Sequence, residues 1–281
     1  FMQSDLPNQV EILVCDNASD DTKNIMEGYV TQYPEAIRYV RHKSNFGMDK
    51  NFWSVIDNAK GEFVHLLGND DRYTDSRLKK ILSQIDKEKD LDVFCLSNNY
   101  LNTLNGKIIE NSESDANDIF CKSSGGTFWL SERLKTLTLS NIVVRKSKCL
   151  EIENIENFFG TNWLHMVLLT LIVKLTTTVC IFNFNNPIVT VRIGNQRWLD
   201  NDVAVAYYYN ALSIYSNLKN IGYENNVFNH IKTFFLQLLY NGSRINYNSK
   251  LLNIVYALKF FRFYYDKPIL YIKFCAKLIL L

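Results

Sequence analysis

The amino-acid sequence predicts an α/β protein with a mostly parallel, Rossmann-like sheet flanked by helices, followed by an all-helical C-terminal extension. Short apolar runs of strand length alternate with amphipathic helical patterns over the first part of the chain. After residue 198, glycine and proline are sparse and apolar residues recur at helical spacing. We therefore expect one domain over residues 1–198, with halves at 1–100 and 101–198, and a helical region over residues 199–281.

The composition narrows the class of protein. Hydrophobic residues make up 47% of the 281 residues and charged residues 21%, as in a folded protein with a substantial core. The net charge of +2 gives no electrostatic reason to expect a nucleic-acid partner. The six cysteines are scattered without a C-x-x-C pair, which argues against a structural zinc site and for reduced thiols. Because no apolar run reaches the ~18 residues of a membrane span and no signal peptide opens the chain, we expect a cytoplasmic protein.

Three strand–helix units are expected in the first half, separated by turn signals. The apolar run Val10–Cys15 suits a strand that is buried on both faces. Ser19 or Asp20 is the candidate N-cap of the following helix, which ends before Pro34. The further expected elements are strands at Ile37–Val40, Phe63–Leu67 and Val93–Leu96, a helix that begins after the polar loop Asn45–Asn51, and a helix near Ser76–Lys89.

Three polar loops follow or lie between these strands, at Asp16–Thr22, Asn45–Asn51 and Gly68–Asp71. Because strand ends converge on one edge of a doubly wound sheet, the three loops can form a single site. The adjacent carboxylates Asp70 and Asp71 suit a hard divalent cation, Mg²⁺ or Mn²⁺, shared with phosphate oxygens. Taken alone, the same Asn-Asp-Asp run also fits a solvated turn that caps the next helix.

These loops resemble motifs of the family 2 glycosyltransferases, which have the nucleotide-diphospho-sugar transferase fold. Val-Cys-Asp-Asn-Ala-Ser-Asp-Asp-Thr at residues 14–22 is similar to that family's strand-to-helix signature. Asn45-x-Gly47-x-Asp49-x-Asn51 resembles its second loop. Residues 59–64 followed by Leu67-Gly68-Asn69-Asp70-Asp71 resemble the strand that leads into its D-x-D-type metal motif. Each motif is weak alone, but three in this order and spacing identify the chain as a member of the family.

The resemblance implies roles in nucleotide binding for the first two loops. Asp16, in one loop with Asn17 and Ser19, would accept a hydrogen bond from the N3–H of uracil or thymine, and its alternative role is a helix cap. Gly47 could instead serve only a tight turn with positive φ. The residues that would line the nucleotide side of the pocket are Asn45, Gly47, Asp49 and Asn51.

The third loop is implied to hold the metal and the diphosphate. Asp70 would bind the Mg²⁺ or Mn²⁺ that bridges the diphosphate, with Asn69 in the same donor site. Asp71 would support Asp70 or touch the donor sugar. The family usually has aspartate where Gly68 stands, so Asp70 is expected to be the only direct protein ligand. The family's first strand and helix, which contact the nucleotide, are also missing from this sequence, and we expect it to begin inside that first helix.

The middle of the chain is expected to supply the acceptor side and the general base. A strand is expected at Asn141–Val144, and Thr161-Asn162 stands where many family members have a Glu-Asp pair. His165, one turn later, resembles the Trp-x-His pattern of the abequosyltransferase-like branch and titrates near neutral pH, so it is the candidate base. The alternative is a structural histidine of the core or of a helix cap. Weaker candidates for the base are Glu153, Glu156 and Asp118, and Trp163 could stack on an acceptor sugar or belong to the core.

Other patterns complete the domain. Asn105-Gly106 between apolar residues indicates a hairpin, and the acidic stretch Glu110–Asp118 indicates a loop. Strands are expected at Thr177–Phe182 and Pro187–Ile193. Arg192 or Arg197 could close over the diphosphate, although each also suits a solvated surface position.

The last third is expected to form helices near residues 199–219, 224–241, 249–264 and 267–281. Residues 251–281 hold five basic residues and one acidic residue, a net charge of +4, and are rich in Phe, Tyr, Leu and Ile. This composition is typical of an interfacial anchor, here at the inner face of the cell membrane. It equally fits a helical subdomain that packs on the catalytic domain with its lysines in water.

We therefore predict a metal-dependent, inverting glycosyltransferase. It would move a sugar from a UDP-, dTDP- or CDP-linked donor to a glycan or polyprenyl-diphosphate-linked acceptor, in bacterial surface-polysaccharide biosynthesis such as capsule or cell-envelope assembly. The alternative is a truncated, catalytically inactive domain that binds membrane or partner proteins through its C-terminal helices. A nucleotidyltransferase would need a Gly-rich, basic phosphate loop, and a dinucleotide oxidoreductase a G-x-G-x-x-G motif after a strand; the sequence shows neither.

Overall fold

The fold is described from a computed structural model of the chain. The structure describes residues 9–74, 77–102, 105–109, 119–123, 138–175, 179–183, 189–193, 202–216, 222–241, 258–261, 263, 268–269 and 271–272. The chain divides into two compact units. The first comprises residues 1–124 and 135–192, and the second comprises residues 125–134 and 193–281. Each is described by itself.

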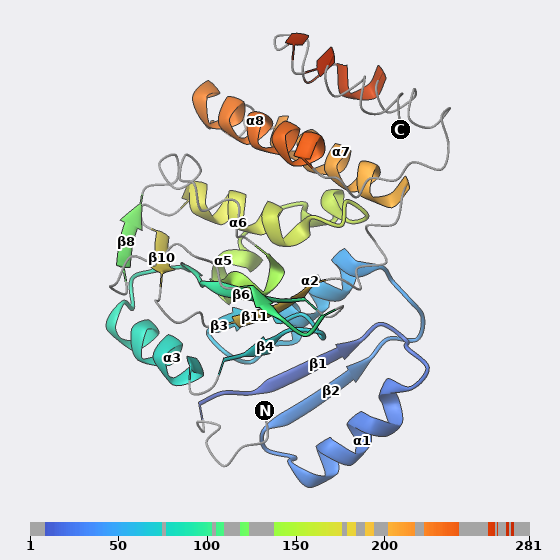
Figure 1. Ribbon diagram of the computed structural model, residues 1–281. Helices are drawn as coiled ribbons and strands as arrows, with labels where there is room; N and C mark the ends of the chain where they lie inside the picture. The colour runs from blue at the N-terminus through green and yellow to red at the C-terminus, as the bar shows by residue number, and fades with distance from the viewer. Residues whose placement is uncertain are drawn as a thin grey trace. The chain divides into compact units, whose positions relative to one another are not determined.

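The first unit opens with a parallel strand pair joined by a helix (Figure 1). Strand β1 (Ile12–Asp16) pairs with β2 (Ile37–Arg41) in a register that sets Asp16 opposite Arg41. The connecting helix α1 (Thr22–Gln32) has Asp21 at its N-cap position, so the expected cap at Ser19 or Asp20 is wrong. Ser19 instead donates its N–H and its hydroxyl to the Asp16 carboxylate, and the helix begins three residues later at Thr22.

The central sheet of this unit has the strand order β3-β9-β5-β10-β8. The alternation of strands and helices is confirmed, whereas parallel pairing is less frequent than expected among the described strands. Two strands cause this. Strand β9, from the second half of the domain, lies antiparallel between β3 and β5, and β8 pairs antiparallel with β10, whereas β5 and β10 are parallel. The strands are β3 (Phe63–His65), β5 (Val93–Cys95), β8 (Ile119–Ser123), β9 (Ile142–Arg145) and β10 (Val179–Asn183).

A smaller sheet has the order β4-β11-β6-β7. Its strands are β4 (Arg72–Tyr73), β6 (Asn98–Asn102), β7 (Ile108–Ile109) and β11 (Val189–Ile193). The predicted hairpin at Asn105-Gly106 is confirmed: β6 and β7 pair antiparallel, and Gly106 has a φ of +67°. Glycine reaches this left-handed conformation at little cost.

Helices flank the sheets and close the core (Figure 1). Within the central sheet, Val93 and Phe94 are fully buried, and burial of a side chain of that size contributes about 2–3 kcal/mol. Cys95 and Cys149 are free thiols and are buried in the same unit, as predicted from the sequence. The helices of this unit are α2 (Met48–Asn58), α3 (Arg77–Lys87), α5 (Lys146–Leu150) and α6 (Leu164–Leu175), with 3-10 turns η2 (Leu139–Asn141) and η3 (Ile155–Phe158).

Arg145 connects the segments that precede β3 and β5, at the end of these strands that lies away from the third polar loop. Its guanidinium donates to Asp92 at 2.7 Å, to Glu62, and to the backbone carbonyls of Lys89 and Leu91. It also lies 4.4 Å from the centre of the Phe63 ring. Because the planar guanidinium satisfies several acceptors at once, one side chain orders this whole edge.

The second unit contains α7 (Asp202–Ser216) and α8 (Asn225–Asn241), close to the two helices expected there. Tyr209 of α7 contacts the rings of Phe260 and Phe263, both of which are buried. Residues 258–261, 263, 268–269 and 271–272 are helical, and the rest of the two last expected helices lies outside the described residues. Within the part of the chain that the structure describes, no helix has the length and apolar character needed to cross a membrane. The acidic stretch Glu110–Asp118, with candidate base Asp118, and Arg197 also lie outside it.

Candidate functional site

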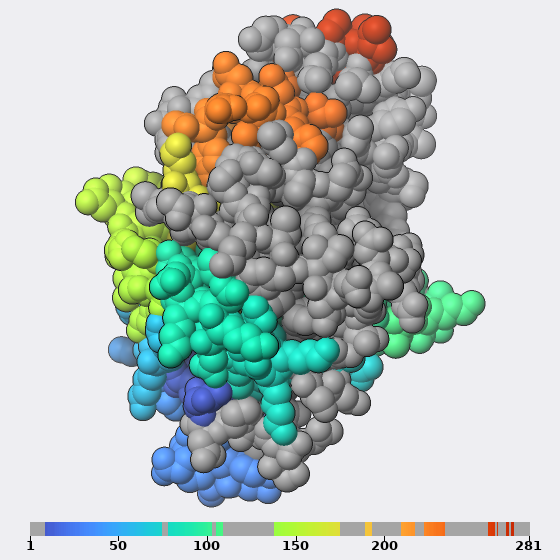
Figure 2. Space-filling model, turned by 90° about the vertical axis from the view of Figure 1, so that its left-hand side faces the viewer, coloured from blue at the N-terminus to red at the C-terminus, as the bar shows by residue number. Residues whose placement is uncertain are grey.

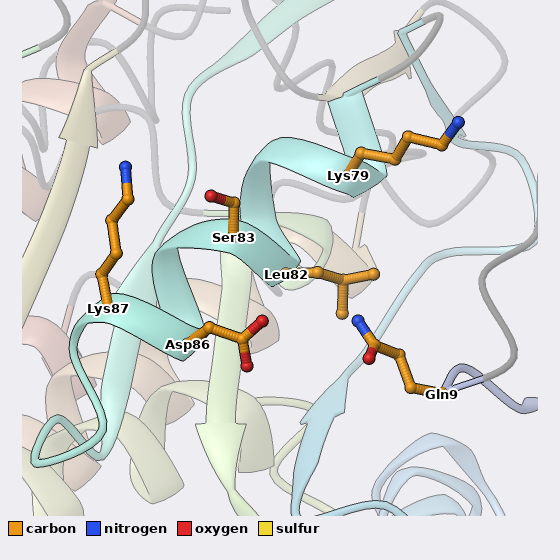
Figure 3. A pocket seen from close by; sticks show the side chains of 6 residues that line it. All are labelled: Gln9, Lys79, Leu82, Ser83, Asp86 and Lys87. Carbon is orange, nitrogen blue, oxygen red and sulfur yellow. The ribbon is translucent and has the colours of Figure 1, made fainter.

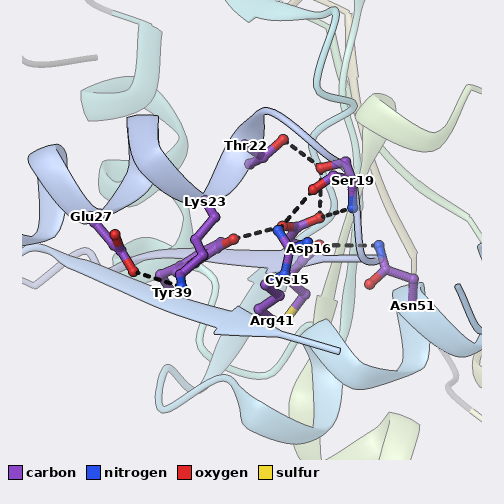
Figure 4. Close-up of polar contacts among 9 residues, drawn as sticks. All are labelled: Cys15, Asp16, Ser19, Thr22, Lys23, Glu27, Tyr39, Arg41 and Asn51. Carbon is purple, nitrogen blue, oxygen red and sulfur yellow. Dashed lines mark hydrogen bonds and ion pairs between the residues drawn. The ribbon is translucent and has the colours of Figure 1, made fainter. Parts of the chain in front are cut away.

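The first polar loop is built around the carboxylate of Asp16, at the end of β1 (Figure 4). Oδ1 accepts hydrogen bonds from the backbone N–H and the hydroxyl of Ser19, at 2.9 and 2.7 Å. Oδ2 accepts from the Tyr39 hydroxyl at 2.6 Å and from Arg41 at 2.8 Å. Burial alone raises the pKa of Asp16, but the hydrogen bonds from Tyr39 and Ser19 and the Arg41 charge outweigh it, so the pKa lies below its usual value.

These four donors fill the acceptor positions of a carboxylate, which number about four. In this conformation Asp16 orders the loop through Ser19 and fixes Arg41, whose guanidinium also donates to the Ser19 carbonyl. A hydrogen bond to the N3–H of a base would require one of these donors to leave. The base-binding role of Asp16 therefore stays a prediction.

The first and second loops lie side by side and are joined by an amide pair. Asn17 Nδ2 donates to Asn45 Oδ1 at 2.7 Å, and Asn17 Oδ1 accepts the backbone N–H of Phe46 at 2.8 Å. Asn51 Nδ2 donates to the carbonyl of Cys15, the last residue but one of β1, at 3.2 Å. Gly47 has a φ of +84°, which explains glycine at this position. Two loops some thirty residues apart thus form one polar surface.

Asp49 is the exception within the second loop. It is buried, and its carboxylate accepts hydrogen bonds from the backbone N–H groups of Asn162 and Leu164, at the start of α6. The side chain thus faces the acceptor-side helix in this structure.

The third loop is held by residues from distant parts of the chain. Ser140 accepts the backbone N–H of Gly68 at 2.8 Å and donates its hydroxyl to Asp71 Oδ2 at 2.5 Å. Asp71 Oδ1 accepts the backbone N–H of Arg192 at 2.9 Å. Burial raises the pKa of Asp71, and the hydrogen bonds from Ser140 and Arg192 oppose this effect. Asn69 and Asp70 are exposed at the tip of the same loop.

His65 of β3 contacts Ser140, the residue that holds the third loop. Its Nε2 lies 2.8 Å from the carbonyl oxygen of Ser140, so Nε2 carries the proton and Nδ1 accepts from the Tyr73 hydroxyl. Desolvation lowers the pKa of His65 to about 4, because the ring nitrogens face protein rather than water. His65, Tyr73 and Ser140 form a neutral hydrogen-bonded group under the carboxylate of Asp71.

The third loop fits a divalent cation. A Cβ built on Gly68 would lie 3.0 Å from Asp71 Oδ2 and 3.2 Å from Asp70 Oδ1, so both carboxylates converge over the bare glycine. Paired carboxylate oxygens are suited to Mg²⁺ or Mn²⁺. Among the described residues no three His, Cys, Asp or Glu side chains gather, so oxygens from a diphosphate or from water would complete the shell.

His165 lies on the first turn of α6 and is 7% exposed. Its ring stacks on Trp163 with centroids 5.9 Å apart and meets Phe52 of α2 edge-on at 6.2 Å. Desolvation lowers its pKa to about 4, and its Nδ1 has no hydrogen-bond partner among the described residues. The side chain is thus neutral at pH 7, in apolar surroundings, and its Nδ1 is left without a partner among the described residues.

Sequence reasoning missed Tyr39, Arg41 and Ser140. The first two were detectable, because they alternate along β2 with period two and so share the face that meets Asp16 across the parallel pair. Ser140 gives no local signal, since it reaches Asp71 across 69 residues of chain. No hydrogen bond between described residues joins the third loop to the first two loops.

A cavity of about 520 Å³ lies elsewhere in the first unit, along α3 (Figure 3). Gln9 faces Leu82 across it, and polar side chains of α3 complete its wall. The lining residues are Gln9, Lys79, Leu82, Ser83, Asp86 and Lys87, none of which belongs to the three loops.

Comparison with known proteins identifies the family. Residues 3–150, more than half of the chain, match the family model described as Glycosyl transferase family 2. The chain belongs to this family. The predicted membership, which rested on the three loop motifs, is thereby confirmed.

Curated relatives of this family 2 chain include the abequosyltransferase RfbV of Salmonella typhimurium, 25% identical over 204 residues, which are 66% of this chain and 58% of RfbV. An uncharacterized protein of Mycobacterium bovis is 34% identical over 86 residues, 30% of this chain and 25% of that protein. The chain thus spans a quarter of one of these relatives and just over half of the other.

Solved structures of S. aureus TarS are similar to this chain in fold. The UDP complex of TarS residues 1–349 matches with a TM-score of 0.56 and 18% identity, over 86% of this chain and 66% of that one. The complex with UDP-GlcNAc matches with a TM-score of 0.59 and 15% identity, over 98% and 83%. The predicted fold class is therefore confirmed for this family 2 chain.

Proposed function

We propose that the chain is a metal-dependent, inverting glycosyltransferase that transfers a sugar from a nucleoside-diphosphate donor. The observation that carries the proposal is the polar surface at the strand ends. Asn17 and Asn45 join the first two loops there, and the Asp70 and Asp71 carboxylates converge over Gly68 in the third. Membership of family 2 and the likeness to a fold that binds UDP-GlcNAc in TarS support a UDP-, dTDP- or CDP-linked donor.

In this proposal the first two loops bind the nucleotide. Asn17, Asn45, Gly47 and Asn51 form the wall of the nucleotide pocket, where amide groups can both donate and accept hydrogen bonds. Asp16 accepts hydrogen bonds from Ser19 and Arg41 and so holds both side chains in place.

The third loop would hold Mg²⁺ or Mn²⁺ through Asp70, with Asp71 as second carboxylate. When bound, the metal would neutralise charge on the departing diphosphate. Ser140 and the Arg192 backbone fix the direction of Asp71, so that its carboxylate lies in place before the donor arrives. This order suits catalysis, because preorganised charges need no rearrangement during the reaction.

His165 is the proposed general base. The acceptor hydroxyl oxygen forms a bond to the anomeric carbon while the bond from that carbon to the diphosphate oxygen breaks. The hydroxyl proton passes to a neutral His165 nitrogen, and the nucleoside diphosphate leaves with the bonding electron pair. A single displacement of this kind inverts the anomeric configuration. Burial lowers the pKa of His165 to about 4, so the expected titration near neutral pH is wrong; the ring is unprotonated at neutral pH but is a weaker base than an ordinary histidine.

We further propose a glycan or polyprenyl-diphosphate-linked acceptor at the inner membrane face, in surface-polysaccharide synthesis. Described residues of the C-terminal segment lie at the molecular surface (Figure 2). The side chains of Leu258, Phe261, Ile269 and Ile272 are 69%, 53%, 71% and 65% exposed, in a segment whose sequence carries a net charge of +4. Exposed apolar side chains among basic residues favour an anionic bilayer surface.

Calorimetric titration tests the donor site. UDP, dTDP, CDP and GDP are each titrated with and without Mn²⁺ into the wild type, Asp70→Asn and the control Asp57→Asn, which changes an exposed carboxylate of α2 outside the three loops. We expect metal-dependent binding of one pyrimidine diphosphate, lost in Asp70→Asn and retained in Asp57→Asn. Equal binding in all three proteins would overturn the metal site. No binding of any nucleotide would favour the alternative, a catalytically inactive domain.

Vesicle co-sedimentation tests the membrane surface separately. The full chain is mixed with phosphatidylcholine vesicles or with vesicles that also contain phosphatidylglycerol. We expect binding only to the anionic vesicles, and its loss in the double variant Phe261→Ser, Ile272→Ser. The control Ile25→Ser removes an exposed apolar side chain from α1 and should bind as the wild type does. Equal sedimentation of both variants would count against this surface.

A further inference from the structure

Asp49 connects two parts of the first unit that are far apart in the sequence. It lies in the first turn of α2 and is only 2% exposed. Oδ2 accepts the backbone N–H of Asn162 at 2.7 Å, and Oδ1 accepts the backbone N–H of Leu164 at 3.1 Å. Both donors lie at the start of α6, more than a hundred residues downstream. One helix thus supplies the cap of another.

The start of α6 needs such a cap. The first N–H groups of a helix have no partner within it, and a negative charge near this end is favourable. The chain also enters α6 through two left-handed residues, Gly160 at φ +88° and Asn162 at φ +61°. Asparagine adopts that conformation only at some cost, and the bond from Asn162 N–H to Asp49 offsets it. Thr161 adds a second local bond, accepting the Trp163 N–H at 3.2 Å.

The other end of this connection is the nucleotide surface. Two residues after Asp49, Asn51 donates to the carbonyl of Cys15 in β1. Before Asp49, Asn45 is paired with Asn17 of the first loop. The segment 45–51 is therefore fixed to the first loop on one side and to α6 on the other.

We propose that Asp49 is a positioning residue that holds the start of α6, and with it His165, in a fixed relation to the first two polar loops. The Asp49 carboxylate is buried and faces the start of α6, so Asp49 acts through His165 and does not touch the donor. This role replaces the donor contact predicted from the sequence motif. Its catalytic meaning rests on the proposed function, because it takes His165 as the base, whereas the mechanical link does not.

Hydrogen exchange of the full chain tests the mechanical link. The variants are Asp49→Ala, Asp49→Asn, which keeps one acceptor oxygen, and the control Asp57→Ala, which removes an exposed carboxylate from the same helix. We expect Asp49→Ala to speed exchange of the Asn162 and Leu164 amides on the order of tenfold, the factor that corresponds to loss of a helix cap. The ¹⁵N resonances of the His165 ring should shift with it. Asp49→Asn should restore part of both effects, and Asp57→Ala should change neither.

If Asp49→Ala fails to fold, Asp49→Asn alone tests the link, through amide exchange at Asn162 and Leu164 and through the ¹⁵N resonances of the His165 ring. Wild-type exchange at Asn162 and Leu164 in a folded Asp49 variant would overturn the proposal. A UDP titration with Mn²⁺ then separates positioning from ligand binding. We expect UDP affinity in Asp49→Asn to stay close to that of the wild type. A large loss of UDP affinity with normal exchange would make Asp49 a donor ligand and also overturn the proposal. If the wild type binds no nucleoside diphosphate, the proposed function fails, and hydrogen exchange still decides the link.

Discussion

The hydroxyl of Ser140 donates a hydrogen bond to Oδ2 of Asp71 at 2.5 Å while it accepts the backbone N–H of Gly68 at 2.8 Å. Ser140→Ala would take a donor from Asp71 and leave the Gly68 N–H without its partner. We expect the free energy of unfolding to fall by about 1–3 kcal/mol. Mn²⁺ affinity should fall roughly 10–100-fold, as for other residues that orient a metal ligand. Urea unfolding and calorimetry with Mn²⁺ and a nucleoside diphosphate measure the two effects.

The matched control is Ser83→Ala, which removes an exposed hydroxyl from α3. It should leave both quantities near their wild-type values. Should Ser140→Ala bind Mn²⁺ as tightly as Ser83→Ala, Ser140 does not hold Asp71 for metal binding.

The order of strands and helices in the first unit was predictable, because burial imposes a period of two or 3.6 on apolar residues. Val10–Cys15 and Ser76–Lys89 lie close to β1 (Ile12–Asp16) and α3 (Arg77–Lys87). The antiparallel insertion of β9 was not predictable, since the apolar run Ile142–Val144 says nothing about which strands it separates. Strand partners depend on long-range packing, and periodicity is a local property.

The candidate site shows the same limit. Motif spacing located the loops that carry Asn17, Asn45 and Asp70, and the structure joins the first two. Motif spacing could not show that the Asp49 carboxylate accepts hydrogen bonds from the start of α6, or that four donors surround Asp16. A motif names the residue types in a loop, whereas the direction of each side chain depends on partners from other elements.

Gly68→Ala is expected to separate the two carboxylates of the third loop. The added Cβ would lie 3.0 Å from Asp71 Oδ2 and 3.2 Å from Asp70 Oδ1, closer than such atoms normally approach. At least one of the two carboxylates must then shift away from the added Cβ, and Mn²⁺ affinity should fall. Gly68→Asp should bind Mn²⁺ no better than the alanine variant, because its own side chain must occupy the same space.

Gly28→Ala serves as the control for Gly68→Ala. A Cβ at Gly28, within α1, meets nothing within 4 Å. The helix should gain about 0.5–1 kcal/mol in stability from this change. Calorimetry with Mn²⁺ should show wild-type affinity for Gly28→Ala and weakened affinity for Gly68→Ala. Equal affinities would mean that the two carboxylates do not bind the metal together.

Asp16→Asn tests whether the buried carboxylate orders the first loop. The change removes the negative charge that faces Arg41 and gives the Tyr39 and Ser19 hydroxyls a weaker acceptor group. Because the Arg41 side chain is 31% exposed and can regain water, we expect a loss of only about 2 kcal/mol in the free energy of unfolding. Urea unfolding measures it, with Asp20→Asn as the exposed control. A change below the experimental error would show that the loop does not depend on this charge.

Two neutral histidines should make the protein less stable in mild acid. The pKa values of His65 and His165 are about 4 in the folded protein, against about 6.5 for an unperturbed histidine. Between these values the unfolded chain binds more protons than the folded chain, so stability is complete above about pH 6.5 and falls as the pH falls towards 4. Each histidine should contribute a slope of about 1 kcal/mol per pH unit at most. The pKa of Asp16 is lowered in the folded protein, so its protonation affects the free energy of unfolding only at a lower pH.

Urea unfolding from about pH 7.5 to about pH 4.5 measures this slope. His165→Phe keeps a ring against Trp163 and Phe52 but cannot bind a proton, so its stability should depend on pH less steeply, by the equivalent of one proton. His65→Asn should flatten the slope by a similar amount, with an added loss at every pH because the bonds to Tyr73 and Ser140 are broken. A slope equal to that of the wild type in both variants would show that neither histidine is buried in its neutral form. The test needs no substrate, since it depends only on the two rings being shielded from water and uncharged in the folded chain.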